Sequence, residues 1–200
     1  MEKYGSDRPD LRVGMAFEEV TDILNNTEYG VFRNIIKKGG VIKGFCVRGQ
    51  GEALSKNVLQ NEYSIKIVPS MGAAGMTWMK VTNGRLQSNI VQFFSPEEQE
   101  NIIERFHAED GDVLMMIAET FREKVNSVLC ELRLHVAKRL DLIPDNLFCP
   151  VWITDFPLFE LKEGRPSSQH HPFTMPDRTD FDPLNIEDLL SLKSRAYDLV

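Results

Sequence analysis

The chain has 200 residues and a formal net charge of −7 at pH 7, with 42% hydrophobic and 26% charged residues. These values are typical of a globular protein that buries a real core. They argue against a free-standing nucleic-acid binder, because such proteins usually carry an excess of basic residues. No stretch approaches the roughly 20 apolar residues of a membrane-spanning helix, so we expect no membrane partner.

The three cysteines, Cys46, Cys130 and Cys149, are widely spaced and form no Cys-x-x-Cys pair. A sparse, odd set of this kind indicates reduced, buried thiols in a reducing compartment. The run Glu-Lys-Tyr-Gly-Ser-Asp-Arg at residues 2–8 is polar, unlike a secretory signal peptide. Together these features predict a cytoplasmic protein.

The first fifty residues indicate a short helix followed by a hairpin. Apolar residues at 17, 20, 23 and 24 have helical spacing. Residues 31–36 and 41–47 are apolar-rich runs that flank Gly39 and Gly40. Two such runs around a glycine pair are typical of a β-hairpin.

The next fifty residues carry three local signals. Ser55 suits the cap of a helix over 56–67. The Asn-Gly pair at 83–84 predicts a hairpin between the strand 76–81 and a short partner. Ser95, followed by Pro-Glu-Glu at 96–98, combines a capping box with proline at the first helical position, so a helix should continue to about residue 107.

A turn at residues 110–112 precedes an apolar run at 113–118, which we expect to be a buried strand. Apolar residues then recur at steps of three and four from 125 to 140, predicting a long helix over about 120–140. Residues 16–145 are therefore expected to form an α+β domain, in which helices pack on a mainly antiparallel sheet.

Beyond residue 150 the pattern changes. Residues 151–160 resemble a strand with one proline, residues 161–188 are rich in Pro, Ser, His and Asp with little periodicity, and residues 196–200 resemble the start of a strand.

Most familiar catalytic patterns are absent from the sequence. The four histidines lack the close ligand spacing of a zinc site, so we expect no metal site. The Gly-Ala-Ala-Gly run at 72–75 lacks the Lys-Ser/Thr of a phosphate-binding loop, and no Gly-x-Ser-x-Gly elbow occurs. The glutamates of the helix 96–107 are expected to form a solvated face.

His170 and His171 are the exception, because they form an adjacent pair followed by Pro172 in a polar, irregular stretch. Proline restricts the preceding residue to extended conformations, in which successive side chains point to opposite sides. One ring can then face a ligand, such as a carboxylate, while the other anchors the loop. From residue types alone we favour a surface loop with incidental histidines, and a ligand site is the alternative.

Three stretches of the sequence resemble a known family of proteins. They are Tyr-Gly-Ser-Asp-Arg-Pro-Asp-Leu-Arg at 4–12, Trp-Ile-Thr-Asp-Phe-Pro-Leu-Phe-Glu at 152–160, and His-His-Pro-Phe-Thr at 170–174. In sequence and order they resemble bacterial aspartyl-tRNA synthetases. The stretch 16–145 is similar in length and element order to the inserted domain that these enzymes share with some tRNA amidotransferase subunits. The resemblance implies that residues 1–15 and 146–200 are segments of a class II catalytic domain.

In this family the parent enzyme, a homodimer, activates L-aspartate with ATP and magnesium and transfers it to tRNA. The resemblance implies that His170, and as second choice His171, contacts L-aspartate, while Asp155 supports the sheet or loop. The family's two ATP-binding arginine motifs do not occur within residues 1–200. We therefore expect no catalytic residue and no bound ATP or magnesium in this chain, which should be inactive alone.

A second hypothesis is a module that positions tRNA without catalysis. Arg33, Lys37, Lys38, Lys43 and Arg48 would then form a basic edge on the expected hairpin, where phosphate contact would be sensitive to salt. We favour the plainer interpretation of a solvated hairpin. A third interpretation is a purely structural insert that stabilises the dimer.

Overall fold

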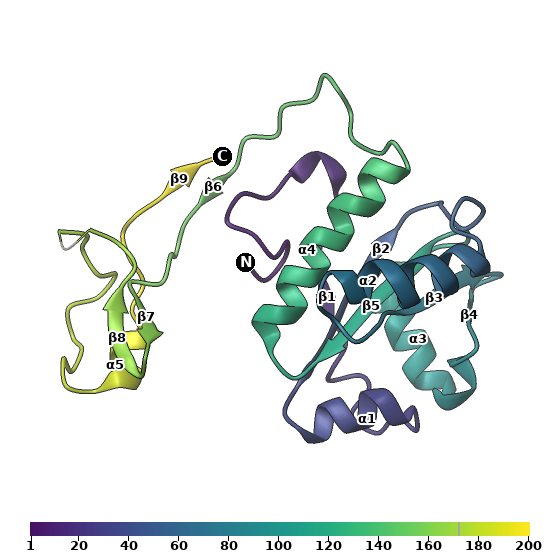
Figure 1. Ribbon diagram of the computed structural model, residues 1–200, viewed down its shortest axis with the longest axis horizontal. Helices are drawn as coiled ribbons and strands as arrows, with labels where there is room; N and C mark the ends of the chain where they lie inside the picture. Colours follow the sequence, from purple (N-terminus) through teal and green to yellow (C-terminus); the bar gives the residue numbers. More distant parts are fainter. Residues whose placement is uncertain (172) are drawn as a thin grey trace. The chain divides into compact units, whose positions relative to one another are not determined.

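The computed structural model describes residues 1–171 and 173–200, which divide into two compact units, Met1–Leu147 and Phe148–Val200. Pro172, which we expected to hold His171 extended, lies outside the described residues. Figure 1 shows the first unit as a sheet with helices and the second as short strands joined by long loops.

Five antiparallel strands form the sheet of the first unit, in the order β1-β2-β5-β3-β4. The central strand β5 pairs with β2 from Val41 opposite Glu119 to Val47 opposite Val113. The strands are β1 Glu18–Glu19, β2 Val41–Val47, β3 Thr77–Thr82, β4 Arg85–Gln87 and β5 Val113–Glu119.

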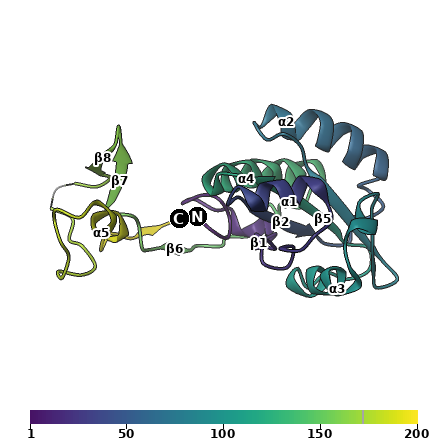
Figure 2. The same ribbon diagram turned by 90° about the horizontal axis from the view of Figure 1, so that it is seen from below.

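Helices cover both faces of this sheet, which is why every residue of β2 is buried. Figure 2 shows α2 and α4 on one side and α3 on the other. The helical elements of this unit are η1 Leu11–Val13, α1 Gly30–Lys37, the π-helix η2 Val58–Ile67, α2 Val68–Ser70, η3 Val91–Phe93, α3 Pro96–Arg105 and α4 Arg122–Arg139.

The two faces of the sheet have separate apolar cores. Phe45 and Met115 pack with Leu129 of α4 on one face, while Ile42 and Leu114 belong to the core on the other. Alternation along a strand sends successive side chains to opposite faces, and it places Lys43 on the same face as Phe45.

Several local predictions are confirmed. Ser95 accepts a hydrogen bond from the amide of Glu98, whose side chain accepts from the amide of Ser95, so the capping box of α3 is complete. Asn83 and Gly84 have φ values of 52° and 68°, as the turn between β3 and β4 requires. Ser55 accepts from the amide of Val58 at the start of a helix, although most of that helix is a π-helix.

The expected hairpin over 31–36 and 41–47 is wrong. The first run is α1, which ends before Gly39 at φ 73°, and β2 pairs with β1 and β5. The run forms a helix because Phe32 and Ile36 lie on one side, where they pack into a core. The expected helix over 17–24 is also wrong, since β1 and a succession of turns occupy that stretch.

In its described residues, 148–171 and 173–200, the second unit has two small antiparallel sheets and a short helix. Strand β6 pairs with β9, and β7 pairs with β8. The expected single strand over 151–160 is therefore divided between β6 and β7. The elements are β6 Trp152–Ile153, β7 Phe159–Lys162, β8 Arg165–Ser168, α5 Ile186–Ser191 and β9 Asp198–Leu199.

These observations establish an α+β chain with a five-stranded antiparallel sheet and several helices. No helix among the described residues is both long and apolar enough to span a membrane.

Candidate functional site

The β7–β8 hairpin leads directly into the histidine pair. The amide of Gln169 donates to the carbonyl of Leu158 at 3.0 Å, which returns the chain to the start of β7. The hydroxyl of Ser168 donates to the carbonyl of His170 at 2.8 Å and so fixes the turn at the first histidine. The backbone of His170 is therefore held by the side chain of Ser168.

The imidazole of His170 is half-buried and packs edge-on against Phe156, with the ring centroids 5.7 Å apart. Its Nε2 atom is inaccessible to solvent and has no hydrogen-bond partner among the described residues. Buried polar side-chain atoms usually have a partner, so this nitrogen is an unusual feature of the hairpin.

His171 lies in a different environment. It is exposed, and its Nδ1 accepts a long hydrogen bond of 3.4 Å from the amide of Phe173, whose ring centroid is 5.1 Å away. The amide of Thr174 donates to the carbonyl of His171 at 2.8 Å, which makes a tight local turn. The two adjacent imidazoles are thus held differently.

A segment distant in sequence supports the loop that follows the pair. The amide of Arg195 donates to the carbonyl of Met175 at 2.9 Å, and the amide of Asp177 donates to the carbonyl of Lys193 at 2.8 Å. Periodicity gave no indication of these pairings, because each joins irregular segments about 16 to 20 residues apart. Asp155 is exposed, and its carboxylate lies 3.9 Å from the ammonium of Lys193.

The five basic residues of the expected hairpin do not form one edge. Lys37 and Lys38 are exposed at the end of α1. Lys43 is 2% exposed and donates to Glu2 and Asn126, so its ammonium is not at the surface. Arg48 is bound to Asp112 at 2.7 Å and to the carbonyl of Phe106 at 2.9 Å. The alternation of β2 was the signal that could have predicted the burial of Lys43.

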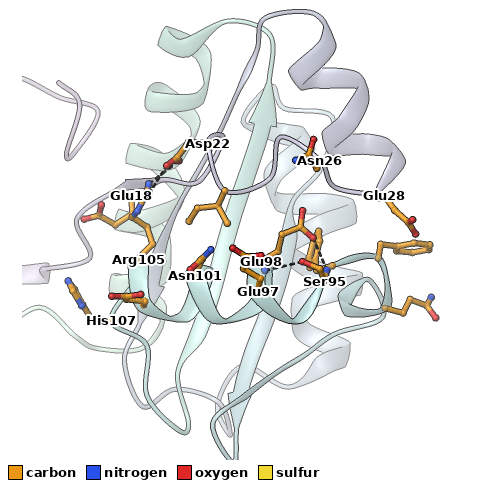
Figure 3. Close-up of a pocket in the computed structure, with 15 residues that line it drawn as sticks. Glu18, Asp22, Asn26, Glu28, Ser95, Glu97, Glu98, Asn101, Arg105 and His107 are labelled. Atoms are coloured by element: carbon orange, nitrogen blue, oxygen red, sulfur yellow. Dashed lines mark hydrogen bonds and ion pairs between the residues drawn. The ribbon is translucent and has the colours of Figure 1, made fainter.

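A polar groove of about 1070 Å³ lies between residues 18–28 and α3 (Figure 3). Arg105 points across it and forms a 2.7 Å ion pair with Asp22. Its other charged side chains are mainly carboxylates, which would repel a phosphate backbone. The acidic and basic residues of its lining are Glu18, Asp22, Glu28, Glu97, Glu98, Glu104, Arg105 and His107.

Asp112 is the most highly connected carboxylate of the first unit. It is buried, and it accepts hydrogen bonds from the amides of Gly49 and Glu109 at 2.8 and 2.9 Å as well as from Arg48. Burial alone would raise the pKa of Asp112, but these donors outweigh it and hold the pKa below its usual value. Asp112 therefore joins the loop after β2 to the turn before β5, which is a structural role.

Comparison with known proteins gives two results. Residues 32–129 match the GAD domain family. The whole chain is 59% identical over 201 residues to an aspartate–tRNA(Asp/Asn) ligase of Syntrophus aciditrophicus (strain SB), of which it covers 28%. Over 208 and 213 residues it is 42% and 41% identical to the aspartate–tRNA(Asp/Asn) ligases of Persephonella marina and Aquifex aeolicus, and it covers 34% of each.

The chain thus contains a GAD domain in its sheet-bearing unit. With this match and its unbroken similarity to those enzymes, the chain is similar over its whole length to a segment of aspartyl-tRNA synthetases. The resemblance that we drew from the three stretches of sequence is confirmed. The chain spans about a third or less of the length of these relatives, from 28% to 34%.

Proposed function

We propose that this chain is the part of an aspartate–tRNA ligase that carries the inserted GAD domain, at residues 16–145, between two segments of the class II catalytic domain, 1–15 and 146–200. The parent enzyme activates L-aspartate with ATP and then transfers it to tRNA. The relatives are named for both tRNA(Asp) and tRNA(Asn), so the proposed activity includes both. We further propose that the parent is a cytoplasmic homodimer.

His170 is the proposed contact for L-aspartate. The observation that carries this assignment is its Nε2 atom, which is buried and without a partner among the described residues. A carboxylate of the substrate would supply the missing hydrogen bond, and a bond to a charged group is stronger than one between neutral groups. His171 is the second choice, because its exposed ring is held only by a local contact.

ATP and magnesium are assigned to other parts of the parent. Among residues 1–171 and 173–200, no group of three or more His, Cys, Asp or Glu side chains fits a metal ion. In the second unit, Arg178 is bound to Asp188 and to the hydroxyl of Ser191. Positioning and neutralising a phosphoryl centre needs such cations to be available. The isolated chain should therefore be inactive.

Aspartate-dependent pyrophosphate exchange tests this proposal, with the complete parent enzyme as the positive control. We expect no exchange by the purified 200-residue chain, and measurable exchange would contradict the proposal. In the parent, His170→Ala should raise KM for aspartate roughly tenfold or more through loss of a charged hydrogen bond. His107→Ala, an exposed histidine of the other unit, is the matched control and should leave KM unchanged.

A second candidate function is tRNA contact through α1. The observation that favours it is that Arg33, Lys37 and Lys38 are all exposed on or beside this helix, and none takes part in an ion pair among the described residues. Lys43 is excluded from this surface by its burial, and Arg48 is occupied by Asp112.

Titration of the chain with tRNA at several salt concentrations tests this second candidate. If α1 contacts phosphates, Lys37→Ala with Lys38→Ala should weaken binding and reduce the slope of log K against log salt by about one for each lost contact. Lys56→Ala, another exposed lysine, is the control. An unchanged slope in the double variant would exclude α1 as a tRNA contact.

A further inference from the structure

Residues 1–14, here called the strap, lie against α4 and the sheet of the first unit (Figure 1). We propose that Arg133 and Lys43 are positioning residues that hold the strap on the GAD-containing unit and so set the direction in which the chain joins this domain. This inference does not depend on the proposed activity. It assigns a role to the stretch 4–12, which the site described above does not use.

Arg133 of α4 carries one half of the attachment. Its side chain is buried, with 1% exposed. Among the described residues, no carboxylate lies within ion-pair distance of its guanidinium. Its guanidinium donates to two carbonyls of the strap, from Nε to Gly14 at 2.8 Å and from Nη2 to Asp10. Its Cζ lies 4.9 Å from the ring centroid of Tyr4, a cation–π contact between α4 and the strap. Burial lowers the pKa of Arg133.

Lys43 of β2 carries the other half. Its buried ammonium donates to the carbonyl and the carboxylate of Glu2 at 2.9 and 2.7 Å, and to Asn126 Oδ1 at 2.8 Å. The hydrogen bond from Lys43 holds the pKa of Glu2 below its usual value. Two of these three acceptor atoms belong to the strap, so the strap supplies most of what compensates the buried charge.

The cost of burying a charge explains why these contacts matter. A buried cation without acceptors is strongly unfavourable, whereas one with well-placed oxygen acceptors is tolerated. Lifting the strap would take two oxygen acceptors from each cation, and water would have to replace them. Each cation therefore favours the docked strap, and the docked strap permits each cation to be buried.

Gly5 shows that the strap fits this surface closely. Its φ is 70°, and a Cβ atom at this position would lie 2.1 Å from the carbonyl oxygen of Asn126 and 2.9 Å from Cβ of Cys130. Both neighbours belong to α4, whose backbone cannot yield easily. A residue larger than glycine would lift the strap from the helix without changing the core.

Amide hydrogen exchange on the complete 200-residue chain tests the proposal. The reporters are the amides of Gly5 and Gly14, which bond within the strap, and of Phe17, which donates to the carbonyl of Lys3 at 2.8 Å. In Arg133→Met and in Gly5→Ala these amides should exchange about tenfold faster or more, relative to the amides of β5. Arg133→Lys should behave similarly, because an ammonium cannot reproduce the planar fork.

Two control variants match these changes. Arg139→Met removes an α4 arginine that pairs with Glu62 at the surface, and Gly84→Ala changes a glycine at φ 68° with open space around it. Neither should accelerate exchange of the strap. Gly5→Ala decides the case if Arg133→Met fails to fold. The proposal would be overturned if Gly5→Ala accelerated amide exchange equally in the strap and in β5, or in neither. It would also be overturned if Arg133→Met folded and its strap amides exchanged at the original rate.

Discussion

The carboxylate of Asp112 and the guanidinium of Arg48 form a 2.7 Å ion pair that joins the start of β5 to the loop after β2. The side chain of Asp112 is 4% exposed while that of Arg48 is 54% exposed, so the pair connects the interior to the surface. It explains why Arg48, which the alternative hypothesis placed on a tRNA-binding edge, is instead part of the fold.

Asp112→Ala should lower the free energy of unfolding of the first unit by about 3 kcal/mol, because it leaves buried donors without an acceptor. Urea unfolding followed by fluorescence of the buried Trp78, with Trp152 replaced by Phe, would measure the change. Asp22→Ala is the control, since its ion pair with Arg105 is more exposed and should contribute about 1 kcal/mol or less. Equal losses in the two variants would contradict the assignment.

Asp112 should also make the first unit sensitive to acid. Its pKa is lowered in the folded state, so its contribution is present above the unfolded value of about 3.9 and is lost as pH falls through the folded value. We expect the free energy of unfolding to decrease below about pH 4. Asp112→Asn should have a lower free energy of unfolding at neutral pH, and this free energy should fall less on acidification than that of the original chain. If the free energies of the two proteins ran parallel against pH, the prediction would be wrong.

The three thiols should differ in reactivity. Burial raises the pKa of Cys46 to about 12, and burial also raises the pKa of Cys130. Only the thiolate is nucleophilic, so both should react slowly with iodoacetamide at pH 8. Cys149, which is partly exposed, should be modified first, with the order read by mass spectrometry of timed samples. Modification of Cys46 before Cys149 in the folded chain would contradict the prediction.

Amides 161–180 should exchange rapidly in the isolated chain. In the second unit, the buried hydrophobic side chains among the described residues are Leu158 and Leu192, whereas Phe173 and Leu184 are about nine-tenths exposed. With so few buried apolar side chains, residues 161–180 are expected to unfold locally. Hydrogen exchange at residue resolution would measure this, with β5 as the protected reference. Protection comparable to that of β5 would mean that this unit is stable alone.

The sequence alone determined those features whose causes lie within a few residues. Three features were predicted correctly because each depends on residues that are close together in the sequence. They are the capping box at Ser95, the turn at Asn83 and Gly84, and the apolar period of α4. The motif at 170–174 also indicated the family, because it depends on residue order and not on packing.

Tertiary structure decided the features that depend on distant partners. The run at 31–36 has no local property that excludes a strand, and it becomes α1 because its apolar side meets a core built from other elements. Lys43 looked like a surface lysine until Glu2 and Asn126, 41 and 83 residues away, compensated its charge. Burial of a cation is a property of its surroundings, which no neighbour in the chain specifies.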